Sequence, residues 1–137
     1  MTTRIYVSHE KEDRGALRAF MMLPSTMHFD FRFLDRSLVD PEKEKDPEYV
    51  RRLIRDRLHA TDATVVLIGA STRESEWVGY EIQESIKRGN ALLGIRAEGQ
   101  GGAGLPPALE EAKAKVIDWA PHEFKAAVEE ALKQAGR

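Results

Sequence analysis

The chain has 137 residues, of which 42% are hydrophobic, so it has the length and composition of one domain with one core, spanning residues 1–137. Its 21 basic residues nearly balance 23 acidic ones, and this balance leaves no overall field that would attract nucleic acid or an anionic membrane surface. The absence of cysteine excludes disulfides, thiolate zinc sites and a cysteine nucleophile, and the lack of a signal peptide or a long apolar run leads us to expect a cytoplasmic protein.

The first third of the chain predicts a strand, a helix, a second strand and a long loop. Residues 4–8 are apolar and rich in β-formers, whereas residues 11–22 carry apolar side chains at helical spacing, and Pro24 is expected to end that helix. Residues 29–34 alternate aromatic with polar side chains, which is typical of a strand with one solvated face, so we expect an edge strand there. Residues 35–46 are polar without periodicity, which indicates a loop.

The middle of the chain predicts two helices and two buried strands. Pro47 suits the first turn of a helix. The apolar stripe of this helix consists of Val50, Ile54 and Leu58. Residues 63–69 form a continuous apolar run, as expected of a central parallel strand that is covered on both faces. Residues 71–74 have the sequence of a capping box at the start of a helix that continues to about Arg88, and residues 91–95 predict another buried strand.

The last forty residues predict a loop, a strand and a helix. Residues 99–104, which are rich in glycine, are expected to form a flexible loop together with Pro106 and Pro107. Residues 115–119 predict a last strand, and Pro121 is expected to open a helix at the end of the sequence. The apolar stripe of that helix consists of Phe124, Val128 and Leu132.

Five strands that alternate with helices or loops predict a flavodoxin-like, doubly wound α/β fold, with right-handed crossovers and a parallel sheet. We expect the strand order 2-1-3-4-5, because the second strand has the pattern of an edge, whereas the first and third have buried patterns. Ligands of such sheets bind beyond the carboxyl ends of the strands. This rule directs the search for a site to residues 8–10, 35–37, 69–71, 96 onward and Asp118.

The helix that follows residue 71 carries one acidic residue close to these strand ends. Trp77, Glu81 and Ser85 share one helix face, whereas Val78, Ile82 and Ile86 are expected to form the face that packs on the sheet. Spacing alone leaves open that Glu81 is an ordinary solvated helix glutamate.

Three motifs resemble those of the TIR-like family related to Thoeris antiphage defence proteins. The most specific is a Trp-x-x-x-Glu pattern within residues 75–82. Residues 5–9 are similar to the opening strand-and-serine motif of TIR domains, although His9 stands where many of them have an aromatic residue. Residues 33–37 resemble the segment that leads into the loop after the second strand. The resemblance covers about residues 3–96.

The resemblance implies a catalytic role for Glu81, because the corresponding glutamate of catalytic TIR domains cleaves NAD+ at the nicotinamide ribose bond. It implies NAD+ as a substrate, with no separate cofactor and no metal. The product would be a cyclic or linear ADP-ribose signal that activates a separate effector, and self-association would accompany it. Nicotinamide leaves as a neutral group, so the chemistry needs a carboxylate that stabilises an oxocarbenium-like ribose.

Substrate contacts are expected around Glu81. Tyr6 and Trp77 are expected to offer stacking surfaces, and Arg36 with Ser37 is expected to meet phosphate or ribose oxygens. A loop arginine that is only solvated is the alternative for Arg36. The expected substrate-binding set also contains Ser8, His9 and Asp35.

Two further expectations concern the loop and the stability of the site. Residues 35–46 are expected to gate the pocket and to help form a self-association surface, because they are long, polar and at the ligand-binding edge. Glu81→Gln is expected to melt at or slightly above the parent temperature, because an unpaired, partly buried carboxylate is costly to a fold.

Several alternatives stay open or are disfavoured by the sequence. A non-catalytic TIR-like adaptor that acts by self-association stays open, as does an enzyme like the nucleoside deoxyribosyltransferases. Residues 99–104 match the pattern GxGxxG, but they do not open a helix in the first βαβ unit, which favours a surface loop. A phosphorylated receiver domain needs an aspartate where residues 68–70 are Ile-Gly-Ala. The histidines show no paired metal-ligand spacing: His9, His28, His59 and His122.

Overall fold

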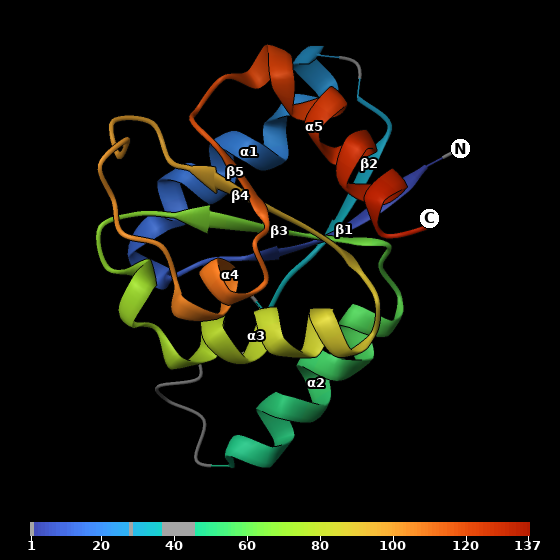
Figure 1. Ribbon diagram of the computed structural model, residues 1–137, viewed down its shortest axis with the longest axis vertical. Coiled ribbons are helices and arrows are strands. Elements are labelled where there is room, and N and C mark those ends of the chain that lie inside the picture. Colours follow the sequence, from blue (N-terminus) through green and yellow to red (C-terminus); the bar gives the residue numbers. More distant parts are fainter. Residues whose placement is uncertain (1, 28, 37–45) are drawn as a thin grey trace.

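The computed structural model describes residues 2–27, 29–36 and 46–137 (Figure 1). Its five strands form one parallel sheet in the order β2-β1-β3-β4-β5, which confirms the expected flavodoxin-like topology. The strands are β1 (Thr3–Ser8), β2 (Phe31–Leu34), β3 (Ala63–Ile68), β4 (Ala91–Arg96) and β5 (Lys115–Ile117). Within the described residues β2 pairs only with β1, so the segment with alternating aromatic residues lies at an edge, as expected.

Helices cover both faces of the sheet (Figure 1). One face is covered by α1 (Arg14–Met27) and α5 (Pro121–Gln134). The other face is covered by α2 (Pro47–His59), α3 (Glu76–Lys87) and α4 (Pro107–Glu111). Two short 3-10 turns, η1 (Lys11–Asp13) and η2 (Thr72–Glu74), precede α1 and α3. No helix in the described part of the chain is long and apolar enough to cross a membrane.

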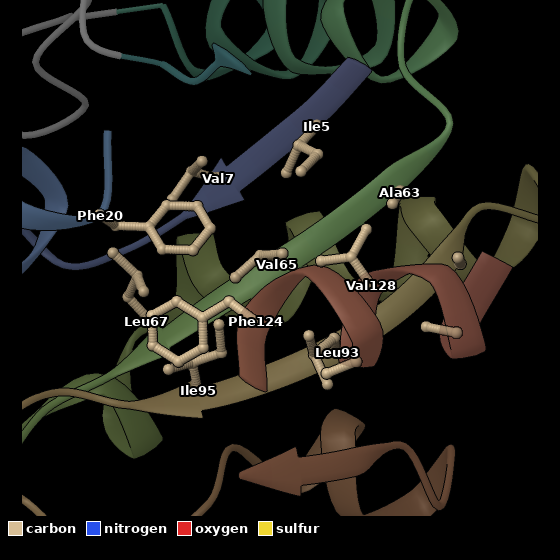
Figure 2. Packing of buried hydrophobic residues seen from close by; sticks show 13 residues of the cluster. Ile5, Val7, Phe20, Ala63, Val65, Leu67, Leu93, Ile95, Phe124 and Val128 are labelled. Atoms are coloured by element: carbon tan, nitrogen blue, oxygen red, sulfur yellow. The ribbon is translucent and has the colours of Figure 1, made fainter. Parts of the chain in front are cut away.

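The central strand β3 determines the two hydrophobic layers, because all six of its residues are buried. Val65 and Leu67 point to one face, where they pack with Phe20 of α1 and Phe124 of α5 (Figure 2). The side chains that alternate with them point to the opposite face and pack against α3 and α4. This alternation is the period-two geometry of a strand that is covered on both sides. The expected central position of β3 is therefore confirmed.

The expected helix at Pro47 is also confirmed. Its apolar stripe is fully buried and packs around the ring of Tyr6 on β1. The stripe consists of Val50, Ile54 and Leu58. Asp46 caps the helix by accepting a hydrogen bond from the backbone N–H of Glu48 at 3.1 Å, which satisfies one of the free donors of the first turn. Residues 37–45 of the expected gating loop lie outside the described residues.

Two expected helix boundaries are wrong. Helix α1 continues through Pro24 to Met27, because this proline lies near the helix end, where the hydroxyls of Ser25 and Thr26 donate to the carbonyl of Met22 at 3.0 and 3.4 Å. Pro107, which was expected in a loop, instead begins α4, because a proline suits the first helical position, where its missing N–H would have no intrahelical partner.

The expected capping box at residues 71–74 is also wrong. Thr72 is buried there, and its hydroxyl accepts from the N–H of Gly69 at 2.8 Å, which holds the segment in the turn η2. Ser75 takes the capping position instead and accepts from the N–H of Val78 at 3.1 Å. Helix α3 consequently begins at Glu76.

Packing at Gly94 of β4 gives a stability test. A Cβ at this position would lie 2.9 Å from Cδ2 of Leu109 and 3.0 Å from Cγ2 of Val116. We expect Gly94→Ala to lower the free energy of unfolding by about 1–3 kcal/mol, because an added methyl group in a packed core displaces its neighbours. Urea unfolding monitored by circular dichroism measures this change.

Gly79→Ala is the matched control, because no atom lies within 4 Å of the new Cβ and alanine is the better helix former. This variant should be as stable as the parent or more stable, by up to about 1 kcal/mol. Equal unfolding midpoints for the two variants would contradict the packing argument.

Candidate active site

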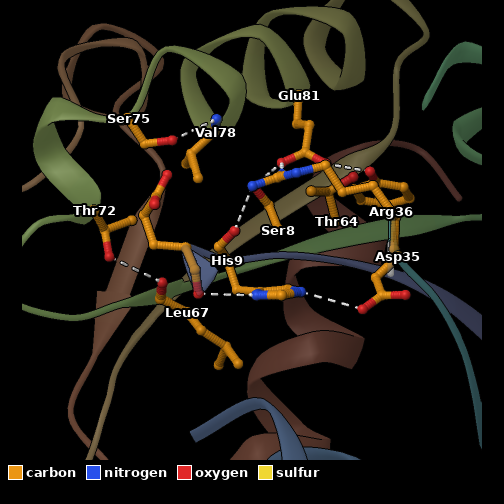
Figure 3. A network of polar contacts seen from close by, with 12 residues as sticks. Ser8, His9, Asp35, Arg36, Thr64, Leu67, Thr72, Ser75, Val78 and Glu81 are labelled. Atoms are coloured by element: carbon orange, nitrogen blue, oxygen red, sulfur yellow. Dashed lines mark hydrogen bonds and ion pairs between the residues drawn. The ribbon is translucent and has the colours of Figure 1, made fainter. Parts of the chain in front are cut away.

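The side chain of Glu81 lies on the inner face of α3, close to the carboxyl ends of β1 and β2 (Figure 3). It is 0% exposed, so the alternative of a solvated glutamate is wrong. The buried face of the helix includes Glu81 and Ser85 next to Val78 and Ile82, whereas Ile86, expected on that face, is 47% exposed. The buried face of α3 therefore includes Glu81 and Ser85 in place of Ile86, which was expected there.

Three described side chains donate hydrogen bonds to the Glu81 carboxylate. Ser8 Oγ donates to Oε1 over 2.7 Å, and the hydroxyl of Tyr6 donates to Oε2. Nη1 of Arg36 also donates to Oε1 and forms an ion pair with it. Serine and tyrosine come from β1, whereas the arginine follows β2, so three separate segments meet at this carboxylate. The buried negative charge thereby has both a counterion and hydrogen-bond donors, as a stable buried charge requires.

Tyr6 acts here through its hydroxyl. Burial raises the pKa of this phenol well above 10.0, and the neighbouring charge of Glu81 raises it further. The residue therefore remains a neutral donor over the physiological pH range. Its ring is fully enclosed by the apolar residues of α2, so the expected stacking surface does not exist in this structure.

Arg36 is 6% exposed, which contradicts the alternative of a merely solvated loop arginine. Burial works to lower the pKa of its guanidinium, but the carboxylate of Glu81 raises it by charge and by hydrogen bonding, and the net pKa lies above the usual value. Nη2 donates to the backbone carbonyl of His9 over 2.7 Å. The planar guanidinium thus bridges a charged and a neutral acceptor.

His9 and Asp35 form a second layer next to this pair. Nε2 of His9 lies 3.1 Å from Oδ2 of Asp35, and Nδ1 lies 3.1 Å from the carbonyl oxygen of Glu10. Arg57 of α2 donates to the backbone carbonyl of Asp35. These contacts hold the residue that precedes Arg36, so they help to orient the arginine toward Glu81.

A hydrogen-bonded chain also supports the helix turn that carries Glu81. Ser85 Oγ donates to the backbone carbonyl of Glu81 over 2.7 Å, and Thr64 Oγ1 lies 2.7 Å from Ser85 Oγ. Because the serine hydroxyl has a single hydrogen, Thr64 is the donor in the second bond. Sequence analysis did not single out Thr64 or Arg57; a lone polar residue within an otherwise apolar strand is the signal for Thr64.

Of the remaining expected residues, Trp77 is partly buried at the start of α3. It packs against the cluster around Tyr6 and makes an edge-on contact with Tyr80 at a centroid distance of 6.0 Å. Ser37 lies outside the described residues. The structure therefore brings together Tyr6, Ser8, His9, Asp35, Arg36 and Glu81.

Two other sequence features stay apart from this cluster. The glycine pattern at residues 99–104 lies between β4 and α4, outside the first βαβ unit. Asp118 pairs with Arg96 at 3.7 Å.

No group of three His, Asp or Glu residues in the described ranges is arranged to hold a metal ion. The chemistry available at the strand ends is therefore that of a buried, preorganised carboxylate, which can stabilise a cation that develops next to it.

The sheet order and the helix layers define the chain as a flavodoxin-like α/β domain, and a solved TIR domain shares this fold. Within this class, the chain belongs to the TIR-like domain family of the Thoeris protein ThsB, whose family model matches residues 6–101. The matched range contains the site from Tyr6 to Glu81. The expected family resemblance is therefore confirmed.

The chain is also similar to individual known proteins. A protein of Bacillus cereus (strain MSX-D12) with the name "Putative cyclic ADP-D-ribose synthase ThsB1" is 43% identical over 61 residues, which are 44% of this chain and 32% of that relative. The TIR domain of the Toll-related receptor TRR-2 from Hydra magnipapillata has a TM-score of 0.57 at 10% identity, over 97% of this chain and 98% of its own. The SEFIR domain of IL-17 receptor B has a TM-score of 0.62 at 12% identity, over 98% and 97%. At these identities the two structures show the fold alone.

The paired state of Glu81 reverses the expectation for the stability of Glu81→Gln. That expectation assumed an unpaired carboxylate, whereas the substitution removes the counterion of a buried arginine. We now expect Glu81→Gln to lower the free energy of unfolding by about 3 kcal/mol, because breaking a buried pair leaves one charge uncompensated. Denaturant unfolding measures the loss.

The double variant Glu81→Gln with Arg36→Gln serves as the control, because it removes both charges. It should recover at least half of the stability lost in the single variant. If adding Arg36→Gln to Glu81→Gln lowered the free energy of unfolding by as much as Arg36→Gln does alone, the two charges would not be coupled.

Proposed function

We propose that the domain cleaves NAD+ at the bond between nicotinamide and ribose, with Glu81 as the catalytic residue. The observation that carries this proposal is the fully buried Glu81 carboxylate at the ligand-binding end of the sheet, fixed by donors from Tyr6, Ser8 and Arg36. Ser8 and Tyr6 preorganise this carboxylate, because their hydrogen bonds need not change when positive charge develops next to it in the transition state.

The reaction suits a single carboxylate. The electron pair of the C–N bond leaves with nicotinamide, which departs as a neutral molecule, so no acid is needed. The remaining C1′ cation is stabilised by the negative charge of Glu81. Water then adds to C1′ and loses a proton, which gives ADP-ribose, or a ring nitrogen of the adenine adds to C1′ and the exocyclic amine of the adenine loses a proton, which gives a cyclic product. Ser8 and Tyr6 orient the carboxylate in either case.

Family membership supports a proposal for the wider function. The name of the Bacillus cereus relative supports a cyclic ADP-ribose product. In this proposal the product is a diffusible nucleotide that activates a separate effector protein in antiphage defence, and the domain self-associates when it is active. NAD+ is a substrate, and the reaction uses no further cofactor. His9, Asp35, Ser37 and Trp77 are proposed to contact the substrate around the carboxylate.

A non-catalytic adaptor is the second candidate, and the closed state of the site favours it. Glu81 has no exposed surface, and its charge is already paired with Arg36. An adaptor would use this ion pair to fix its shape for self-association. The two candidates differ in one measurable respect, because only the enzyme releases nicotinamide.

The test is to incubate the purified protein with NAD+, at low concentration and at concentrations at which it self-associates, and to identify the products by chromatography and mass spectrometry. We expect nicotinamide from the parent, and a rate lower by about 100- to 1,000-fold in Glu81→Gln, which is the usual effect of removing one preorganised electrostatic contact. The mass spectrum distinguishes the products, since the cyclic form has one water less than ADP-ribose.

Glu76→Gln is the matched control, because it removes an exposed carboxylate from the first turn of the same helix. Its rate should stay within about twofold of the parent. A Glu81→Gln variant that is folded and still cleaves NAD+ at the parental rate would show that another group is catalytic. A parent without turnover in the assembled state would favour the adaptor.

A further inference from the structure

Of the three described donors to the Glu81 carboxylate, only Arg36 retains exposed surface, because Tyr6 and Ser8 are 0% exposed. The side chain of the arginine is 7% exposed, whereas that of the glutamate is 0% exposed, and the two form an ion pair. A ribose ring that approaches this carboxylate must therefore displace the guanidinium. Substrate binding at Glu81 therefore replaces the contact with Arg36 by a contact with the substrate.

Such an exchange is constrained by charge. Separating the two groups leaves a buried anion and a buried cation, and each is costly without a new partner. An effective substrate has to supply a positive charge next to Glu81 and a negative charge next to Arg36. NAD+ carries both, because its nicotinamide ring is cationic and its diphosphate is anionic. Nicotinamide riboside carries the same cationic ring and ribose, but no phosphate.

We propose that Arg36 determines specificity by exchanging Glu81 for the diphosphate of the substrate, so that only phosphate-bearing pyridinium nucleotides free the carboxylate. This inference rests on the proposed cleavage of NAD+. It assigns to Arg36 a role at the substrate that is distinct from its role as a counterion in the closed site.

The local geometry suits a guanidinium that changes one partner and keeps another. Nη2 already donates to the backbone carbonyl of His9 over 2.7 Å, which is a neutral acceptor and needs no replacement. The preceding residue is held independently, since Asp35 contacts both His9 and Arg57. The remaining N–H groups can therefore turn from Glu81 to phosphate oxygens while the backbone stays in place. Arginine suits this exchange, because its planar N–H fork fits carboxylate and phosphate oxygens alike.

The kinetic test compares kcat/KM for NAD+ with kcat/KM for nicotinamide riboside. The parent should prefer NAD+ by on the order of 1,000-fold, and Arg36→Gln should reduce this preference by on the order of 100-fold, the effect of losing hydrogen bonds to a charged group. Arg36→Lys keeps the charge without the fork and should reduce the preference by about tenfold. Arg36→Lys also tests the proposal if Arg36→Gln does not fold.

The control is Arg52→Gln, which removes an exposed arginine of α2 away from the site. It should leave the preference within about twofold of the parent. If the parent cleaves nicotinamide riboside as efficiently as NAD+, or if the Arg36 variants keep the full preference, the exchange is overturned while NAD+ cleavage stands.

A binding measurement separates this inference from the proposed function. Calorimetry with carba-NAD+ tests the diphosphate contact without catalysis, since this analogue keeps the cationic nicotinamide ring and the diphosphate, and its carbocycle in place of the nicotinamide ribose prevents cleavage. We expect Arg36→Lys to weaken its binding by about tenfold, with no change in Arg52→Gln. Binding that depends on Arg36, in a parent that cleaves neither substrate, would support the exchange and overturn the proposed enzyme. Binding that is absent, or equal in all three proteins, would overturn the exchange.

Discussion

The arrangement of the site depends on the buried ion pair between Arg36 and Glu81. The two residues are 45 positions apart in the sequence, and their contact ties the end of the edge strand to the inner face of α3. Removing both charges from water is costly, so the pair persists only because further groups satisfy it. Ser8 and Tyr6 donate further hydrogen bonds to the carboxylate, and the carbonyl of His9 accepts a hydrogen bond from the guanidinium. The polar cluster therefore fixes how β1, β2 and α3 meet.

The fold could be predicted from the sequence because its main signals are local. The apolar run at residues 63–69 corresponds to the central strand, and the alternating aromatic residues at 29–34 correspond to the edge. Helix boundaries were less predictable, because they depend on contacts that a local pattern does not contain. Ser71, for example, does not cap the helix as expected, because its hydroxyl donates to the carboxylate of Glu12 instead.

The sequence predicted most residues of the site, but it did not predict how their side chains are arranged. Family resemblance pointed to Glu81, and the strand-end rule pointed to Ser8 and Arg36, all of which the structure brings together. The sequence could not show that Tyr6 contributes a hydroxyl rather than a ring face, because this depends on the packing of α2 over β1. Nor could it show that the carboxylate is closed off, since burial results from the packing of several segments at once.

The position of Arg36 directly after β2 has a consequence for the internal dynamics of the domain. This strand has four residues and, in the described part of the chain, shares one ladder with β1, whereas β3 is paired on both sides and buried throughout. Local unfolding in proteins begins where backbone hydrogen bonds are fewest and most accessible. Amide hydrogens of β2 should therefore exchange with solvent before those of β3, at a free energy below that of global unfolding. The ion pair with Glu81 is thus attached to an edge of the sheet that opens more readily than its centre, and the site can become accessible while the core remains folded.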